Sequence, residues 1–466
     1  MNRLFPSVLT MSVRSSWVFA VFLSGVALLF SGCGDSSDVG LGVGPDSDSL
    51  KGGQPVTFNI SPELDTTRLV PQTGRDLTPS LGGSAPTWRF LVGRVDDPLT
   101  GGSATEAEGY MDVSPPSSLP DRISSADPDS IAAELRLSPT YVHGDTTSSV
   151  DIEVRELEEN AEMDRARADT SFPVGSFATN GPVSVSPNPD DSLVTIGLSD
   201  AWVEDRLDDL QQDSLDAFFG FKLTAGSSED AVIGFSAGSA SLRLTHRGDS
   251  TTADYNALKV FTHVEQTGPP ASPPDTTSHR LLQDGVGTGL EARWNFDESP
   301  LDTLATDPLN RAQIFVPVDT DEMEAATISS PTDTSDFVRP LPKGFRIIAT
   351  RESAPGTPSC SAVRAAVFSE DGRECAFPVA PSAAPGAAVV SNEVAFPTFD
   401  QSFQRIRNDQ PPVFEDVRLF IADRESTSGN PQSTIQPGLP TTLPILVATE
   451  GEDPGPPRAT LTVTPL

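Results

Sequence analysis

The sequence predicts a mainly β protein: two similar antiparallel β-sandwich-like modules, each with one short helix, behind a cleaved signal peptide. Short apolar runs alternate with polar residues at a period of two, which is typical of half-buried strands. The 43 prolines and 36 glycines leave little room for long helices. The order of these elements also repeats in the two halves of the chain. The expected parts are a signal peptide (1–32), a flexible acidic tether (33–53), a first β-rich module (54–247), a connecting segment with a Pro/Ser/Thr spacer (248–284) and a second β-rich module (285–466).

The N-terminal segment is typical of an exported protein. Residues 18–30 form an apolar run, and Arg3 and Arg14 precede it with no acidic residue among them. The run is shorter than the roughly 20 residues that a membrane-spanning helix needs, so it predicts the apolar core of a signal peptide. Translation starts at Met1 or at Met11, which would give a more usual length before the run.

The end of this run resembles the bacterial lipobox. Small residues, Ser31 and Gly32, precede Cys33, and in lipoproteins such a cysteine receives a diacylglyceryl group and becomes the first residue of the mature chain. The resemblance implies an acylated, palmitate-type anchor, because stable attachment takes more than one acyl chain. An ordinary cleaved signal or an uncleaved anchor are the alternatives. Acidic residues directly after Cys33, at positions 35 and 38, also resemble the surface-export signal of Bacteroidota lipoproteins, with a generic acidic linker as the alternative.

The mature chain is strongly acidic. Removal of residues 1–32 leaves 29 basic residues against 66 acidic ones, a net charge of −37. A field of this sign repels nucleic acid and anionic lipid, so we expect neither as a partner. The composition resembles that of proteins from salt-loving bacteria, where the excess acid is solvated surface.

Two cysteines remain after Cys33. Cys360 and Cys375 predict one disulfide, because an exported chain meets an oxidising environment. A metal pair is the weaker alternative, since none of the four histidines lies near them in the sequence.

The first module has one helix among several strands. Ser199 or Asp200 caps this helix, and Val203, Leu207 and Leu210 line one face. A hairpin is expected where two strands meet across residues 143–145, His-Gly-Asp. The strands are predicted within residues 55–61, 87–95, 129–142, 148–157, 192–200, 218–225, 230–236 and 239–246, with one more at 258–264 in the connecting segment.

The second module repeats strand, strand, strand, helix, strand, strand, strand. Its helix is predicted at 400–408, where Phe399, Phe403 and Ile406 repeat the spacing of four and three. Chance similarity between two β-rich halves is the alternative. The strands are predicted within 308–319, 343–352, 392–399, 415–423, 441–449 and 459–466.

Several short motifs together resemble a domain of unknown function in Bacteroidota-type outer-membrane lipoproteins. In that family a strand runs into Gly-x-x-x-Asp-Pro-x-x-Gly, later strands open with Asp-Ser-x and Asn-Arg-Ala, and a turn has the form Tyr-Gly-Asp. The resemblance implies an anchored extracytoplasmic β protein and supplies no activity. The matching residues here are Gly93, Asp97, Pro98 and Gly101; Asp129, Ser130 and Ile131; Asn310, Arg311 and Ala312; and, with His in place of Tyr, His143, Gly144 and Asp145.

No catalytic or metal site is predicted. Residues 234–238 fit the Gly-x-Ser-x-Gly pattern of serine hydrolases, but that motif works between a strand and a helix, whereas strands are expected on both sides here. The acidic clusters at 96–97, 190–191 and 319–322 lack the spacing of a calcium loop. Trp88, Trp202 and Trp294 are expected in or beside the core and not as sugar-binding platforms.

We therefore expect a non-enzymatic lipoprotein of the cell envelope, anchored to the outer membrane, with a structural or interaction role and no cofactor. Whether it faces the cell surface or the periplasm is open. A module that binds glycan or another extracellular polymer is the alternative, and the partners are then an envelope protein or a polysaccharide.

Overall fold

The computed structural model describes the larger part of the chain from residue 55 onwards. Within it, residues Gln54–Pro465 form one compact unit. The signal peptide, Cys33, the tether, Cys360, Trp294, Asp190, Asp191 and the helix expected at 400–408 lie outside the described residues. Those residues are 55–68, 70–71, 73–77, 88–187, 193–212, 215, 218–226, 230–273, 275–293, 309–317, 319, 321–323, 336–340, 344–350, 367–368, 374–379, 393–397, 416–422, 442, 444–450 and 458–463.

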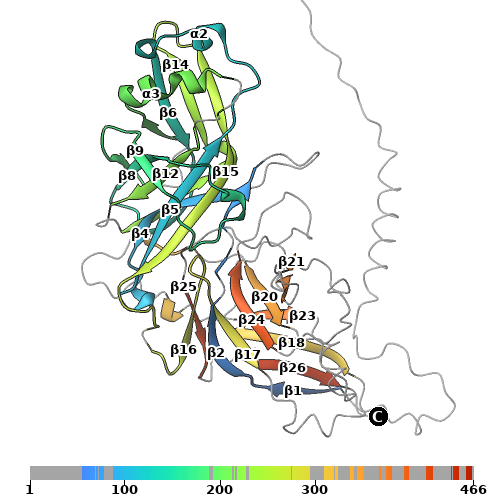
Figure 1. Ribbon diagram of the computed structural model, residues 1–466. Helices are drawn as coiled ribbons and strands as arrows, with labels where there is room; N and C mark the ends of the chain where they lie inside the picture. Colours follow the sequence, from blue (N-terminus) through green and yellow to red (C-terminus); the bar gives the residue numbers. More distant parts are fainter. Residues whose placement is uncertain are drawn as a thin grey trace, which may run out of the picture. The chain divides into compact units, whose positions relative to one another are not determined.

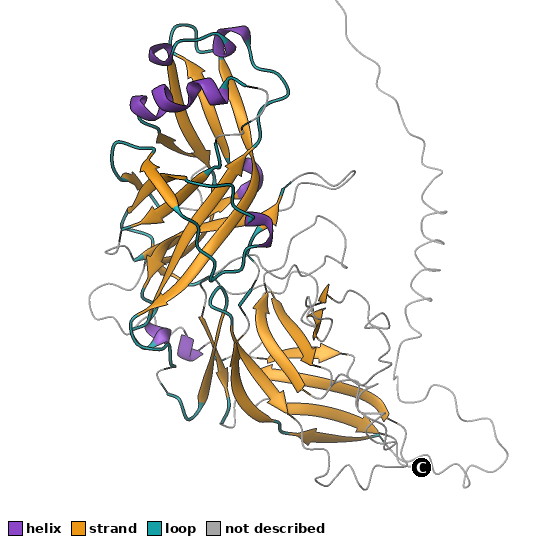
Figure 2. Ribbon diagram, viewed as in Figure 1, coloured by secondary structure: helices purple, strands orange, loops and turns teal. Residues whose placement is uncertain are grey.

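The described chain is mainly β, as the sequence predicts, and its strand pairs are antiparallel (Figures 1 and 2). The helical elements are short: η1 (Pro98–Thr100), α2 (Asp121–Ser124), η2 (Pro128–Ser130), η3 (Met163–Arg165), α3 (Asp200–Leu210) and η4 (Ala237–Ser239). The strands before the connecting segment are β1 (Val56–Ile60), β2 (Glu63–Arg68), β3 (Arg75–Asp76), β4 (Arg89–Val95), β5 (Ala104–Val113), β6 (Ile131–Leu137), β7 (Pro139–Asp145), β8 (Val150–Leu157), β9 (Val174–Phe177), β10 (Val183–Val185), β11 (Val194–Gly197), β12 (Phe221–Ala225), β13 (Ala231–Ser236) and β14 (Ser241–His246). The later strands are β15 (Thr252–Thr267), β16 (His279–Gln283), β17 (Thr288–Arg293), β18 (Leu309–Pro317), β19 (Phe337–Val338), β20 (Gly344–Thr350), β21 (Val367–Phe368), β22 (Glu374–Val379), β23 (Glu393–Pro397), β24 (Asp416–Ala422), β25 (Pro444–Ala448) and β26 (Arg458–Val463).

The strands form three sheets. A 14-stranded sheet follows the order β11-β6-β14-β15-β5-β4-β13-β7-β19, with β3, β8, β9, β10 and β12 branching from it. An eight-stranded sheet follows β21-β22-β20-β24-β17-β16-β25, with β2 on β17. A four-stranded sheet has the order β1-β26-β18-β23. The first sheet is built almost wholly from the first half of the chain, and the other two combine the second half with β1 and β2.

Strand pairing repeats between the two halves. In the first half β6 pairs with β11 and β14, and in the second half β18 pairs with β23 and β26. In the same way β8 pairs with β12 as β20 pairs with β24. Strand β5 pairs with both β4 and β12, as β17 pairs with both β16 and β24. Strand β13 pairs with β4 as β25 pairs with β16. The described strands of the two halves therefore repeat both their order in the sequence and their pairing.

The last strand of the first half has its counterpart at the N-terminus. Strand β15 pairs with β14 through its first residues and with β5 through the rest, with a register shift between Ala257 and Lys259. In the second half β1 pairs with β26, and β2 pairs with β17. Ser61 and Pro62 separate β1 from β2 where β15 has its register shift. The strands that close the second half, β1 and β2, therefore precede the whole first half in the sequence.

Two expectations differ from this arrangement. Residues 54–68 fall within the first module by sequence, but β1 and β2 pair with strands of the second half. The connecting segment contains β15, which is a central strand of the first sheet and longer than the expected 258–264. The expected boundaries were placed by proline and glycine content. This content indicates where the chain turns, but it does not indicate which sheet a strand joins.

The predicted hairpin across residues 143–145 is wrong. These residues end strand β7, which pairs with β13 and β19, whereas β8 pairs with β9, β10 and β12. Gly144 has φ = 115°, and a Cβ there would lie 2.2 Å from the carbonyl oxygen of Asp230. Glycine is therefore needed at position 144 because β7 passes close to the backbone of Asp230, just before β13. The His-Gly-Asp sequence reflects this close packing and not a turn.

The first half has a continuous apolar core against which α3 packs. Ser199 is the N-cap, and its hydroxyl accepts the backbone N–H of Trp202. Trp202, Val203, Leu207 and Leu210 are buried, as the spacing predicts. Trp202 packs against Phe218 and Phe221 with ring centroids 6.0 and 5.5 Å apart. This face fixes the helix on the sheet by aromatic and aliphatic contact.

An ion pair adds a polar attachment for the same helix. Glu156 of β8 is 4% exposed, and its Oε2 accepts hydrogen bonds from Trp202 Nε1 at 3.1 Å and Arg206 Nε at 2.9 Å. Arg206 Nη2 lies 2.8 Å from Glu156 Oε1. The carboxylate therefore has partners on both oxygens, which a buried charge requires.

Candidate functional site

The candidate site is a buried polar cluster around Asp97, at the end of strand β4. The Asp-Pro-x-x-Gly motif forms a single helical turn, η1, in which Asp97 is the N-cap and Pro98 the first residue. Asp97 Oδ1 accepts the backbone N–H of Leu99 at 2.9 Å. Gly101 ends the turn at φ = 66°, a conformation that favours glycine. The motif therefore holds the Asp97 carboxylate in a fixed orientation.

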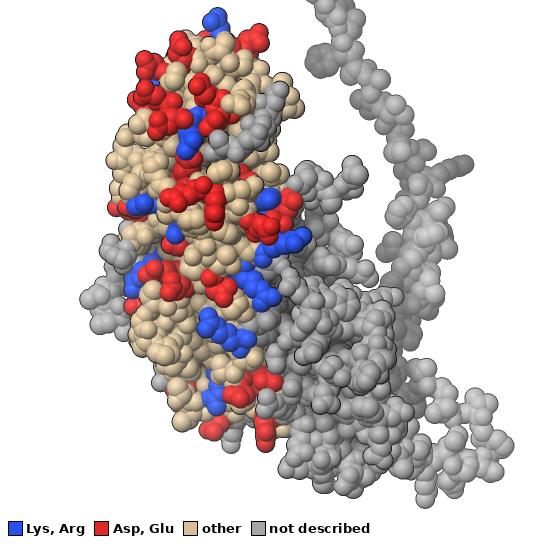
Figure 3. All heavy atoms as spheres, viewed as in Figure 1, with Lys and Arg blue, Asp and Glu red and all other residues tan. Residues whose placement is uncertain are grey.

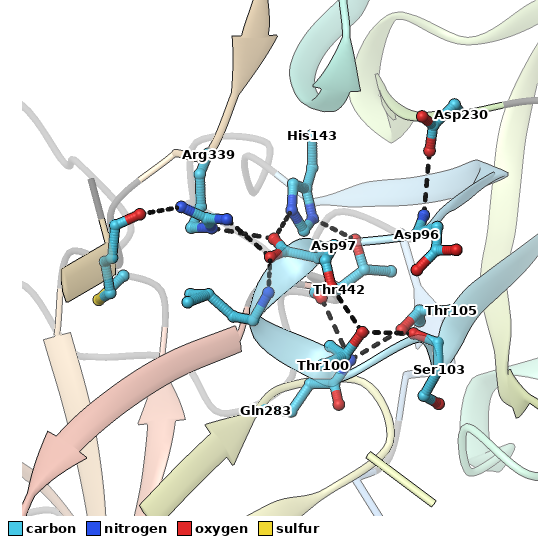
Figure 4. Close-up of polar contacts among 12 residues, drawn as sticks. Asp96, Asp97, Thr100, Ser103, Thr105, His143, Asp230, Gln283, Arg339 and Thr442 are labelled. Atoms are coloured by element: carbon cyan, nitrogen blue, oxygen red, sulfur yellow. Dashed lines mark hydrogen bonds and ion pairs between the residues drawn. The ribbon is translucent and has the colours of Figure 1, made fainter. Parts of the chain in front are cut away.

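His143 of β7 connects Asp97 to a distant part of the chain. Its Nε2 lies 2.7 Å from Asp97 Oδ2, and its Nδ1 lies 3.0 Å from the hydroxyl oxygen of Thr442, which precedes β25. All three side chains are almost fully buried: His143 and Thr442 have no exposed surface and Asp97 has 2%. Figure 4 shows His143 between its two partners.

Arg339, directly after β19, completes the partners of Asp97. Its Nη2 lies 2.6 Å from Asp97 Oδ1 and its Nε 2.9 Å from Asp97 Oδ2, which is the two-pronged geometry of a strong arginine–carboxylate pair. Its Nη1 donates to the carbonyl oxygen of Met323 at 2.7 Å. Asp97 thus accepts four hydrogen bonds, two on each oxygen (Figure 4).

These contacts determine the charge state of Asp97. Burial alone would raise the pKa of the carboxyl group, but hydrogen bonds and charge from His143 and Arg339 outweigh it and lower the pKa to about 2. A carboxylate can only accept hydrogen bonds, so His143 carries a proton on Nε2. The other ring nitrogen, Nδ1, lies 3.0 Å from the Thr442 hydroxyl oxygen, and the Arg339 guanidinium balances the charge of Asp97.

Gln283, the last residue of β16, extends the cluster. Its Nε2 donates to Thr105 Oγ1 at 2.7 Å, and it lies 3.5 Å from the backbone carbonyl oxygen of Thr442. Its Oε1 accepts a hydrogen bond from Gln266 Nε2 at 2.5 Å. Gln283 is 1% exposed and Thr105 also 1%. The carboxamide is therefore held on both its nitrogen and its oxygen. Figure 4 shows Gln283 with Thr105 and Thr442.

The connectivity hydroxyl–imidazole–carboxylate is that of a hydrolase triad, but the surroundings differ. A hydrolase needs its hydroxyl open to a substrate and to water. Thr442 Oγ1 belongs to a side chain with no exposed surface, and the carboxylate is already paired with Arg339. The arrangement can orient and activate a hydroxyl but cannot present it to an external substrate.

The Gly-x-Ser-x-Gly motif has the structure expected from its flanking strands. Strand β13 ends at Ser236, the one-turn η4 (Ala237–Ser239) follows, and β14 begins at Ser241. No α-helix follows the serine, so the strand–helix turn of a nucleophile elbow is not formed. Among the described residues, no group of three His, Cys, Asp or Glu side chains could hold a metal ion.

The other predicted site residues are only partly described. Cys375 lies in β22, opposite Ala349 and Phe368, while Cys360 and Cys33 lie outside the described residues. Of the acidic clusters, Asp97 belongs to the buried network, and Asp319 pairs with His279 at 3.0 Å. Neither is thereby free to act as a solvated calcium ligand.

The described aromatic residues lie mostly inside. Trp88 is 8% exposed and Trp202 3%, as their sequence context predicts. The three tyrosines, at 110, 141 and 255, are also buried. Phe177 is the exception at 45% exposure, with the Arg155 guanidinium carbon 3.6 Å from its ring centroid. One partly covered ring does not make the flat aromatic surface that sugars stack on.

The sequence singled out Asp97 only as part of a motif and of an acidic cluster, and it indicated neither the buried network nor the partners of Asp97. His143 was expected in a turn. Arg339, Thr442 and Gln283 carried no local signal, because their contacts with Asp97, His143 and Thr442 span 159 or more residues. A lone histidine followed by a close-packed glycine in a β-rich stretch was the one available sign that residue 143 is in the core.

No protein-family model matches the chain, and no curated protein matches it. Among solved structures, a "putative secreted protein" from Parabacteroides distasonis is similar at 9% identity, with a TM-score of 0.20, over 85% of this chain and 99% of that one. No helix among the described residues is long and apolar enough to cross a membrane.

Proposed function

We propose that this chain is a lipid-anchored extracytoplasmic lipoprotein of the outer membrane, with a non-enzymatic structural or interaction role. The observation that carries the proposal is the placement of Cys33, which follows small residues at the end of an apolar run of signal-peptide length. The resemblance of the Asp-Pro-x-x-Gly and Asn-Arg-Ala motifs to Bacteroidota-type lipoproteins agrees with it.

The structure supports a role as a displayed body. The residues that follow the tether form β1 and β2, which belong to the second half of the fold. An anchor at Cys33 would therefore join the folded body through its second half. Acidic side chains outnumber basic ones on the face shown in Figure 3, which favours solvation and disfavours contact with anionic lipid.

The non-enzymatic role rests on the character of the candidate site. Its hydroxyl, imidazole and carboxylate are buried, and their partners come from strands far apart in the sequence. Such a cluster joins segments of the fold. The glycan-binding alternative has less support, because the described tryptophans and tyrosines are buried.

The lipid anchor is tested by mass spectrometry of the N-terminal peptide and by detergent partitioning of the mature chain. We expect a diacylated Cys33 and partitioning into the detergent phase, and a Cys33→Ala variant should lose both. Cys375→Ala is the matched control and should keep both. An unmodified Cys33 thiol, or an intact Met1 or Met11 terminus in mature material, would contradict the proposal. A glycan array probed with the mature chain addresses the alternative, which gains support only from specific binding.

A further inference from the structure

The buried cluster holds every group that an acyl transfer between two side chains needs. The Thr442 hydroxyl is a nucleophile, hydrogen-bonded to His143 Nδ1 at 3.0 Å. Asp97 holds the opposite ring nitrogen at 2.7 Å and so fixes the tautomer in which Nδ1 can accept a proton. The Gln283 carboxamide is the electrophile, and its nitrogen lies 3.5 Å from the carbonyl oxygen of Thr442.

Strand register and a direct contact make the two residues neighbours. Gln283 pairs with Pro444 across β16 and β25, and Thr442 lies two residues before Pro444 in the sequence. The carboxamide nitrogen of Gln283 also contacts the backbone carbonyl oxygen of Thr442. We propose that Thr442 and Gln283 form an intramolecular ester cross-link, made by the chain itself with release of ammonia.

The reaction balances with the groups present. Thr442 Oγ1 bonds to Gln283 Cδ while His143 Nδ1 takes the hydroxyl proton. The negative charge that develops on Gln283 Oε1 is stabilised by Gln266 Nε2, which already donates to that oxygen at 2.5 Å. The Cδ–Nε2 bond then breaks, and His143 returns the proton to the departing nitrogen, which leaves as ammonia. No oxidant, metal or cofactor is needed.

Arg339 has a defined part in this scheme as a positioning residue. It keeps Asp97 ionised and aligned through two hydrogen bonds at 2.6 and 2.9 Å. The imidazolium exists only between the two proton transfers, together with the negative charge on Gln283 Oε1, so the net charge of the buried site does not change. Burial also excludes water, which protects the ester from hydrolysis once it has formed.

The cross-link would give the second half a covalent closure. The ester would join Gln283, at the end of β16, to Thr442, in the segment before β25. Residues 284–441 would then form a covalently closed loop. A protein displayed outside the cell gains from such a closure, since cross-linking a long loop restricts the unfolded chain. The proposal does not depend on the lipid anchor.

A tryptic digest of the full mature chain tests the proposal. Trypsin releases Gln283 in peptide 281–293 and Thr442 in peptide 425–458. We expect the two linear peptides to be depleted and replaced by one species with their summed mass less one ammonia. Hydroxylamine, which cleaves esters, should split it. Both linear peptides at full yield from the unmodified chain would overturn the proposal.

Three variants assign the roles. Thr442→Val keeps the side-chain shape without the hydroxyl and should abolish the cross-link, as should His143→Gln. Thr179→Val is the matched control: Thr179 is also buried, at 5% exposure, but takes part in none of the hydrogen bonds described for the cluster, so this variant should cross-link. Retention of the cross-link in Thr442→Val would overturn the assignment. Hydrogen exchange of the β7 and β25 amides shows that each variant is folded.

Discussion

Replacement of Asp97 by asparagine should remove a specific part of the chain's stability and its dependence on acid. Asp97 has a folded-state pKa of about 2 against an ordinary value of 3.8. A carboxyl group with a lowered pKa stabilises the folded state above its ordinary pKa, and this contribution disappears as the pH falls through the folded value. The wild-type chain should therefore lose stability between about pH 4 and pH 2.

The size of the effect follows from the same shift. Each pKa unit corresponds to about 1.4 kcal/mol, so Asp97 contributes about 2–3 kcal/mol at neutral pH. Because Asp97 is 2% exposed, no large discount for solvent screening applies. The asparagine side chain would also leave the Arg339 guanidinium without its carboxylate in a buried place, and breaking such a pair costs about 3–5 kcal/mol. We expect a total loss at pH 7 in that range.

The assay is urea denaturation at a series of pH values, followed by tryptophan fluorescence. It is best done in a Thr442→Val background, so that an ester cross-link contributes to neither protein. Asp97→Asn should be less stable at pH 7 and should lack the decline that Asp97 causes between pH 4 and 2. Asp96→Asn, at the exposed neighbouring carboxylate, is the control and should follow the parent. Equal stability of Asp97→Asn and its parent at pH 7, or an unchanged acid decline, would refute the reasoning.

Three further predictions concern other parts of the fold. Burial raises the pKa of Asp112 from 3.8 to about 6 in spite of its hydrogen bond from the Val113 N–H, so stability should fall as the pH rises from about 4 to 6. Asp112→Asn should therefore gain about 3 kcal/mol at pH 7 and should lack that pH dependence when melting is measured across this range. Glu156→Ala should cost about 2–3 kcal/mol in urea denaturation because it leaves Trp202 Nε1 and Arg206 without their acceptor, whereas Glu204→Ala, on the exposed face of α3, should stay within about 0.5 kcal/mol; equal effects would contradict the role of Glu156. Deletion of residues 54–68 should accelerate hydrogen exchange in β17 and β26 and leave β5 and β14 protected, while deletion of the tether alone should change neither pair.

Local signals predicted the elements well. Alternating apolar residues located β4, β8, β13 and β14 within a few residues, and capping by Ser199 with the four-and-three spacing located α3. The single strand expected within 129–142 is two strands, β6 and β7. These features depend on neighbours a few residues apart, so they are present in the sequence itself. The repeated order of strands in the two halves was visible for the same reason.

Pairing and the site were not predictable in this way. Nothing in Val56–Ile60 indicates that it pairs with Arg458–Val463, because an alternating strand fits any apolar edge of the right length. The partners of Asp97 come from three separate segments, and each of them alone is an ordinary polar residue. The local sequence at Gly144 did report a constraint, but the constraint was close packing against Asp230 and not a turn.

The position of the closing strand links the fold to the proposed anchor. The first half completes its sheets with β15, its own last strand, whereas the second half uses β1 and β2 from the opposite end of the chain. A pull on the N-terminus would therefore load the β1–β26 and β2–β17 pairings directly and would reach the first half only through the second. The proposed bond between Thr442 and Gln283 would lie within this half. It would connect β16 to the segment before β25. The half that follows the proposed anchor is thus the one in which a cross-link would resist force most usefully.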